Sequence, residues 1–128
     1  MLHRSATALL VAPMSFFGIM LLLGKGPIFA TVLHLGYEPY FARMLGTAKL
    51  LGVAAIVCGR FPRLKEHAYT GFAFDFIAAV VSHWAVGDSW LFILLPLPAL
   101  TVLAVSYASW IALHPWLHPL LEREPPHR

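Results

Sequence analysis

The sequence predicts an all-α membrane protein, a four-transmembrane-helix bundle with a short amphipathic segment between its first two spans. Hydrophobic residues make up 59% of the 128 residues and charged residues only 12%, and the mean hydropathy is +0.75. A soluble domain has about half apolar and a quarter charged residues. Four stretches approach the roughly 20 apolar residues that cross a bilayer. We expect one membrane domain over residues 1–113 and a Pro-rich, flexible cytoplasmic tail over 114–128.

The first span is predicted over residues 5–23, where Pro13 should kink the helix and the stretch "GKGP" ends it. The next stretch, 28–44, is mildly amphipathic and too polar around His34 to Arg43 to span. Its tyrosines, Tyr37 and Tyr40, are typical of the headgroup level. This stretch is therefore expected to be an interfacial segment or a short helix.

The other three spans are predicted over residues 44–58, 68–86 and 90–113. The polar stretch "GRFPRLKEH" separates the second span from the third, and "GDS" ends the third. The last span has Pro96 and Pro98 near its start, and "HP" closes it. These breaks predict short connections between antiparallel helices.

The basic residues indicate how the spans are oriented. The net charge is +3, but the basic residues form short clusters at the ends of apolar stretches, so no nucleic-acid binding is predicted. With four spans, one side of the membrane carries Arg4, Arg60, Arg63, Lys65, Arg123 and Arg128. The other side carries Lys25 and Arg43. Since basic loops stay in the cytoplasm, both termini are expected there.

Two ionisable residues fall within predicted spans, Lys49 in the second and Asp75 in the third. Such residues usually face the bundle interior and find partners, because each costs roughly 2.5–3.5 kcal/mol at the membrane centre. Small residues share the helical face of Asp75: Gly71, Ala78, Ala79 and Ser82. A small-residue stripe permits close helix approach, so Asp75 is expected to point into the bundle.

The two residues lie at compatible depths on antiparallel helices, about 10–14 Å from the cytoplasmic ends. This predicts an ion pair between Lys49 and Asp75, or a water-bridged equivalent. Two interpretations of the pair stay open. It fixes the register of the helices, or it forms part of a proton relay or polar ligand site.

The histidines are less specific. His83 lies two turns further out than Asp75, near the "GDS" turn, where it is either a hydrogen-bonded structural residue or a proton acceptor at a cavity entrance. Haem or metal ligation would need a second ligand, for which His34 is the candidate. No spaced ligand motif is present, and no metal site is predicted. Four histidines near the termini are expected to be solvated: His3, His114, His118 and His127.

Several different short sequence motifs follow one another along most of the chain, from about residue 16 to 110. They are His34–Phe41, Leu45–Gly52, Lys65–Phe72, Ser82-His83 and Gly87-Asp88. Their order and spacing resemble the DoxX-like family of small bacterial membrane proteins. The resemblance implies a four-helix membrane bundle in the bacterial inner membrane. It also implies a redox association, because the family name comes from a subunit of a thiosulfate:quinone oxidoreductase. His67 departs from the pattern, since the family usually has tryptophan there.

Three functions remain open from the sequence. The first is a redox-associated subunit that binds a quinone-like lipophilic molecule, with Lys49, Asp75 and His83 as the reactive or proton-moving groups. The second is a cofactor-independent membrane enzyme, such as an isomerase or epoxide-opening catalyst, with Asp75 as acid or base. The third is a non-catalytic assembly subunit that docks other membrane subunits or a second copy. Five further residues are candidates for ligand contact: His34, Tyr37, Tyr69, Ser82 and Tyr107.

Overall fold

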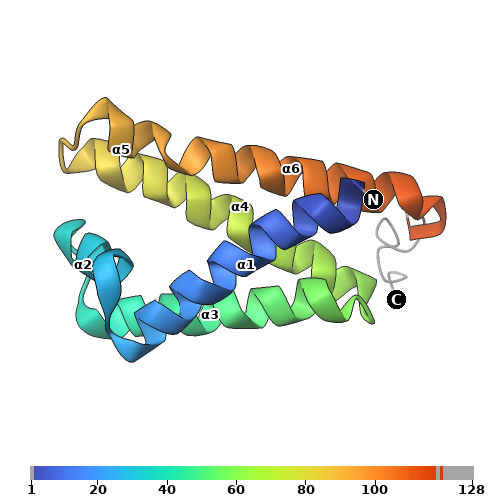
Figure 1. The fold of residues 1–128 in the computed structure, drawn as a ribbon, viewed down its shortest axis with the longest axis horizontal. Helices are drawn as coiled ribbons and strands as arrows, with labels where there is room; N and C mark the ends of the chain where they lie inside the picture. The colour runs from blue at the N-terminus through green and yellow to red at the C-terminus, as the bar shows by residue number, and fades with distance from the viewer. Residues whose placement is uncertain (1, 118, 120–128) are drawn as a thin grey trace, which may run out of the picture.

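The computed structural model describes residues 2–117 and 119, and this part of the chain is helical with short connections (Figure 1). Six α-helices and one 3₁₀ turn follow one another along it. They are α1 (Leu2–Leu23), α2 (Gly26–His34), α3 (Pro39–Cys58), α4 (Pro62–Ala85), α5 (Trp90–Leu94), α6 (Pro96–Leu113) and the turn η1 (Pro115–Leu117). The all-helical fold class is confirmed for these residues.

Proline and glycine define the helix ends. Helices α2, α3, α4 and α6 each have proline in their first two positions, where its missing N–H has no partner to lose. Helix α3 ends at Gly59, whose φ of 59° gives the left-handed conformation that closes a helix without strain. These proline starts place α3 and α4 earlier in the sequence than the predicted spans.

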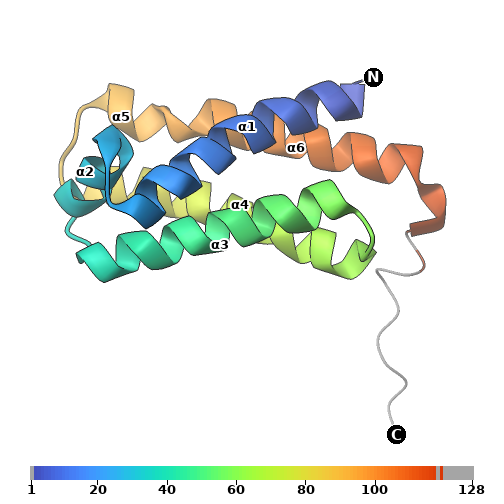
Figure 2. The same ribbon diagram turned by 60° about the horizontal axis from the view of Figure 1, so that its bottom comes forward.

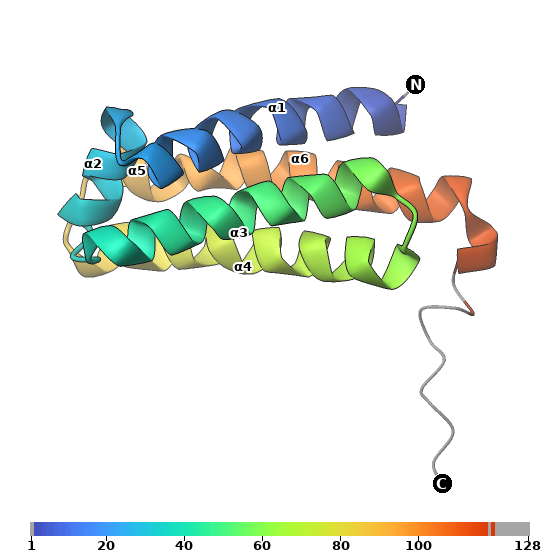
Figure 3. The same cartoon turned by 90° about the horizontal axis from the view of Figure 1, so that it is seen from below.

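The four long helices pack in a ring. Helix α1 contacts α3 and α6, and α4 also contacts α3 and α6 (Figures 2 and 3). The closest approach is between α1 and α3, where a Cβ on Gly46 would lie 2.6 Å from the carbonyl oxygen of Gly18. A core of buried apolar side chains fills the ring, including Leu10, Phe72 and Trp110.

The two ends of the ring differ. The start of α1, the α3–α4 loop and the end of α6 lie at one end, which we call the terminal end (Figure 1). Helices α2 and α5 and the α4–α5 turn lie at the other, which we call the α2 end. The stretch between the first two spans thus contains a short helix, one of the two forms predicted for it.

Among the described residues, three segments are long and apolar enough to cross a membrane: Leu2–Leu23, Pro39–Cys58 and Trp90–Leu113. The last is divided at Leu95 into α5 and α6, where Pro96 begins the second helix. Helix α4 has 24 residues but is not among these segments, because it is less apolar than the other long helices. The predicted count of four spans is therefore not established by length and apolarity. Most of the predicted tail, 114–128, lies outside the described residues.

Candidate functional site

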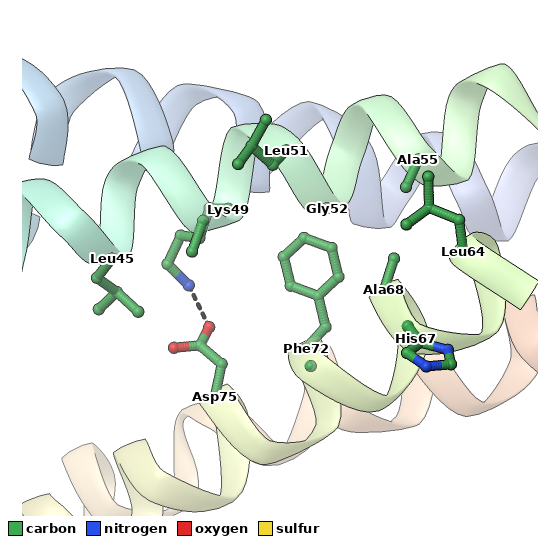
Figure 4. A pocket seen from close by; sticks show the side chains of 12 residues that line it. Leu45, Lys49, Leu51, Gly52, Ala55, Leu64, His67, Ala68, Phe72 and Asp75 are labelled. Carbon is green, nitrogen blue, oxygen red and sulfur yellow. Dashed lines mark hydrogen bonds and ion pairs between the residues drawn. The ribbon is translucent and has the colours of Figure 1, made fainter.

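A groove of about 300 Å³ lies between α3 and α4 (Figure 4). Most of its wall is apolar or backbone. Leu45, Ala48, Leu51, Gly52 and Ala55 line it from α3, and Leu64, Ala68, Gly71 and Phe72 line it from α4. Three side chains that ionise or carry charge also line it: Lys49, Asp75 and His67. The groove is therefore a mainly apolar space with a few polar groups at defined places.

The predicted ion pair between Lys49 and Asp75 is present. In Figure 4 the two side chains point toward one another across the α3–α4 interface, and the ammonium Nζ donates to the Oδ2 of Asp75. Lys49 is 8% exposed and the side chain of Asp75 is 18% exposed. The other neighbours of Nζ are apolar, with the Met14 sulfur at 3.9 Å and the Phe76 ring centroid at 5.9 Å. The carboxylate is thus the charged partner that stabilises the ammonium within this wall.

The expectation that small residues beside Asp75 bring another helix close is wrong for Gly71. A Cβ at Gly71 would meet no atom within 4 Å, and Ala78 is exposed. The close approaches are instead at Gly46 against α1 and at Gly52, where a Cβ would lie 2.9 Å from the Phe72 ring. Helical periodicity predicts which residues share a face of α4, but it does not predict which face packs against another helix.

A second polar cluster lies at the α2 end. The carboxylate of Asp88 accepts hydrogen bonds from His34 Nε2 at 2.8 Å and from His83 Nδ1 at 2.6 Å. The hydrogen bond from His34, and then that from His83, lower the pKa of the Asp88 carboxyl below its ordinary value. Nearby, the hydroxyls of Tyr37 and Ser82 are 2.8 Å apart. The cluster joins the α2–α3 region to the α4–α5 turn.

A third cluster connects α1, α4 and α6 near the terminal end. The Tyr69 hydroxyl lies 2.6 Å from the Ser106 hydroxyl, which in turn lies 2.8 Å from that of Thr7. His3 Nδ1 donates to the Ser106 carbonyl at 3.0 Å. His3 is therefore part of a packed network, and the expectation that it is solvated is wrong.

Two neighbouring residues of α4 extend this third cluster. Lys65 is 6% exposed, and its Nζ lies 4.7 Å from the Trp110 ring centroid and 3.5 Å from His3 Nε2. The Tyr107 hydroxyl donates to Glu66 Oε1 at 2.7 Å. These contacts hold helices together in the half of the ring away from α2.

The predicted site residues thus fall in three places. Lys49 and Asp75 lie in the groove. His34, Tyr37, Ser82 and His83 lie at the α2 end. Tyr69 and Tyr107 lie in the network near the terminal end. The space expected between Lys49, Asp75 and His83 is not this groove, which extends from the ion pair toward His67 instead.

Sequence reasoning missed two residues that organise these clusters, Asp88 and Lys65. In the sequence, Asp88 is recognisable only as the second residue of a Gly-Asp turn. No neighbouring residue indicates that it lies beside His34, which is far away in the sequence. The sequence places Lys65 in the polar stretch between the second and third predicted spans. Its burial follows from α4 beginning at Pro62, which brings Lys65 inside the helix and onto the face packed against α6.

Among the described residues, no group of three His, Cys, Asp or Glu side chains is arranged to hold a metal ion. His34 and His83 approach each other through the carboxylate of Asp88.

Apolar helices long enough to cross a bilayer, packed around buried polar contacts, define an integral membrane protein. A model of the DoxX-like family matches residues 5–106, most of the chain, and the protein belongs to this family. Comparisons with curated proteins and with solved structures found no match.

Proposed function

We propose that this protein binds a lipophilic molecule with a quinone-like head in the groove between α3 and α4. The observation that carries the proposal is the Lys49–Asp75 ion pair in the wall of an otherwise apolar groove. Binding sites for small molecules commonly combine an apolar lining with a few placed polar groups. Polar side chains within a membrane helix are by default candidates for function.

The chemistry of the lining fits such a head. The ammonium of Lys49 has three N–H donors, so it can donate to a carbonyl oxygen of the ligand while keeping Asp75. Phe72 and the aliphatic side chains suit a flat ring. A volume of about 300 Å³ lies at the lower end of the range for ligand pockets. The groove would therefore hold the head, with an alkyl chain following the helices.

A bound quinone would supply two-electron redox chemistry, consistent with the redox association of the family. The residues of this chain would bind and orient it: Lys49 as donor to the head and Asp75 as the group that fixes the lysine. Cys58 is the single cysteine of the chain, so dithiol exchange within the chain is no part of the proposal.

We also propose that α4 is a fourth span and that the terminal end faces the cytoplasm of a bacterial inner membrane. Helix α4 is as long as the other spans and packs against two of them. Arg4, Arg60 and Lys65 belong to the terminal end, whereas Lys25 and Arg43 belong to the α2 end, as cytoplasmic termini require. Reporter fusions to each terminus, active only in the cytoplasm, test this orientation.

The binding experiment uses the full chain in lipid nanodiscs and a benzoquinone with a plain decyl chain as the probe. We expect saturable binding, weakened at least tenfold in Lys49→Met and in Asp75→Asn. Losing a hydrogen bond to a charged donor is worth about 1.5–3 kcal/mol, roughly a factor of ten or more. A mutation that fills the groove, Gly71→Leu, should also weaken binding, because the added side chain meets open space there.

The matched control is Ala78→Leu, which adds a similar side chain to an exposed position of the same helix outside the groove. It should bind the probe as the unmodified protein does. Equal binding by the unmodified protein, Lys49→Met and Gly71→Leu would contradict the proposal. If binding is equal in this way, the charges of Lys49 and Asp75 are exchanged in a double variant. Formation of a membrane complex that either single variant has lost would then favour an assembly role.

A further inference from the structure

The groove has a third polar side chain, His67, which lies nearer the terminal end than the ion pair (Figure 4). Figure 4 shows it on α4 beside Leu64 and Ala68, with the ring of Phe72 between it and Asp75. We propose that His67 is a second ligand contact, so that the groove selects lipophilic molecules with a hydroxyl about six carbons from a quinone-like head. This inference rests on the proposed function and narrows its ligand class.

The hydrogen bonding of His67 leaves one ring nitrogen for a ligand. Nδ1 lies 2.8 Å from the carbonyl oxygen of Arg63. A carbonyl oxygen only accepts, so Nδ1 carries the hydrogen and, in the neutral ring, Nε2 is an acceptor. Among the described residues no partner is recorded for Nε2, and the side chain is exposed. A donor group on a ligand in the groove fits this nitrogen.

The distance between the ion pair and His67 determines where on the ligand the donor group should be. Asp75 and His67 are eight residues apart on one helix, which corresponds to about 12 Å along its axis at 1.5 Å per residue. The α4 lining between them is Ala68, Gly71 and Phe72, which suits methylene groups. The ring of the head occupies part of this span, so a ligand with its head at the ion pair reaches His67 through an extended chain of roughly six carbons.

A hydroxyl is the terminal group that this wall accepts best. It donates to the neutral imidazole, and it accepts from the ring if both nitrogens carry hydrogen. A carboxylate or phosphate would bring an uncompensated charge beside Leu64, Ala68 and Phe72, which carries a large desolvation penalty. A plain methyl terminus leaves Nε2 without a ligand contact. The terminal hydroxyl thus distinguishes the proposed ligand class from ordinary alkyl quinones.

The test compares two probes with the same benzoquinone head in the same nanodiscs, one with a hexyl chain and one with a 6-hydroxyhexyl chain. Affinities are corrected for the partitioning of each probe into protein-free nanodiscs. We expect the hydroxylated probe to bind about threefold to tenfold more tightly, as one net hydrogen bond allows. In His67→Phe the two probes should bind equally.

The control variant is His114→Phe. His114 also bonds through Nδ1 to the carbonyl four residues earlier, that of Trp110 at 3.0 Å, but it lies outside the groove. This variant should keep the preference for the hydroxyl. A second measurement needs no variant: in the unmodified protein a 3-hydroxypropyl chain should show no gain over a plain propyl chain, because its hydroxyl does not reach His67.

Each outcome decides the question. Tighter binding of the 6-hydroxyhexyl probe that requires His67 and the longer chain supports the inference. Equal binding of the two hexyl probes, or a preference that persists in His67→Phe, overturns the inference and leaves the proposed function standing. Failure of every probe to bind overturns both.

Discussion

At the scale of single residues, Lys49 and Asp75 present opposite charges within largely apolar surroundings. Taking both from water has a penalty that their attraction offsets only in good geometry. The pair is thus weak evidence for stability. Removing one partner should nevertheless lower the free energy of unfolding strongly, because the remaining charge then has no partner in the α3–α4 wall.

A double-mutant cycle measures this coupling. Asp75→Asn leaves the buried Lys49 ammonium unpaired and should lower the free energy of unfolding by about 3 kcal/mol. The double variant Lys49→Met with Asp75→Asn should lose less than the sum of the single variants. Unfolding in detergent micelles, followed by circular dichroism, gives the four values. Strict additivity would show that the two residues do not interact.

The cluster at the α2 end predicts a pH dependence. Hydrogen bonds from His34 and His83 lower the pKa of Asp88 from its ordinary 3.8. The folded protein therefore binds this proton more weakly than the unfolded chain does. The stabilisation is complete above the ordinary pKa, and it is lost as the pH falls through the lower folded-state pKa.

The measurement is the unfolding midpoint of the unmodified protein and of Asp88→Asn at a series of pH values. The advantage of the unmodified protein should shrink as the pH falls below the ordinary pKa of 3.8. All other carboxyl groups are the same in both proteins, so the difference isolates Asp88. An advantage that does not change on acidification would contradict this account of the cluster.

At the scale of helices, glycine has opposite roles in two places. Gly46 lets α3 approach α1 so closely that a Cβ would lie 2.6 Å from the carbonyl oxygen of Gly18, whereas a Cβ on Gly71 would meet open space. Backbone atoms at the first site do not move aside as a flexible side chain would. Close backbone approach of this kind is typical of membrane helix interfaces.

The matched variants Gly46→Ala and Gly71→Ala test this difference. The first should destabilise the protein by about 1–3 kcal/mol, as overpacking does. The second should be neutral or stabilising by up to about 1 kcal/mol, since alanine favours a helix more than glycine. Thermal unfolding of both variants provides the comparison. Equal effects would mean that the α1–α3 contact is looser than described.

The helices themselves could be predicted from the sequence because their ends depend on local residues. The "GKGP" and "GDS" breaks coincide with the ends of α1 and α4. The structure differs from the prediction where α3 and α4 begin earlier, at prolines, and where the last span is divided at Leu95. The Lys49–Asp75 pair was also predictable, since depth along two antiparallel helices follows from residue counts. The groove could not be predicted, because it depends on which face of α4 remains uncovered. The link between His34 and Asp88 requires the positions of α2 and the α4–α5 turn.

At the scale of the whole molecule, the polar clusters of the described residues lie at three places along the ring: the α2 end, the groove, and the region near the terminal end. Those at the α2 end and near the terminal end join helices through direct hydrogen bonds. The Lys49–Asp75 pair differs, because it lines a groove that lies between two helices and not within the packed core. In our proposal, ligand binding belongs to the groove, and the other two clusters hold the helices together.

Photo-crosslinking tests that assignment most directly. A benzoquinone with a photoreactive diazirine on its head is illuminated with the full chain in nanodiscs, and the labelled peptides are located by mass spectrometry. Labels should concentrate in 45–55 of α3 and 64–75 of α4, and unlabelled decyl benzoquinone should suppress them. Labels confined to α1, α6 or the α2 end, or spread evenly and insensitive to competitor, would contradict the account.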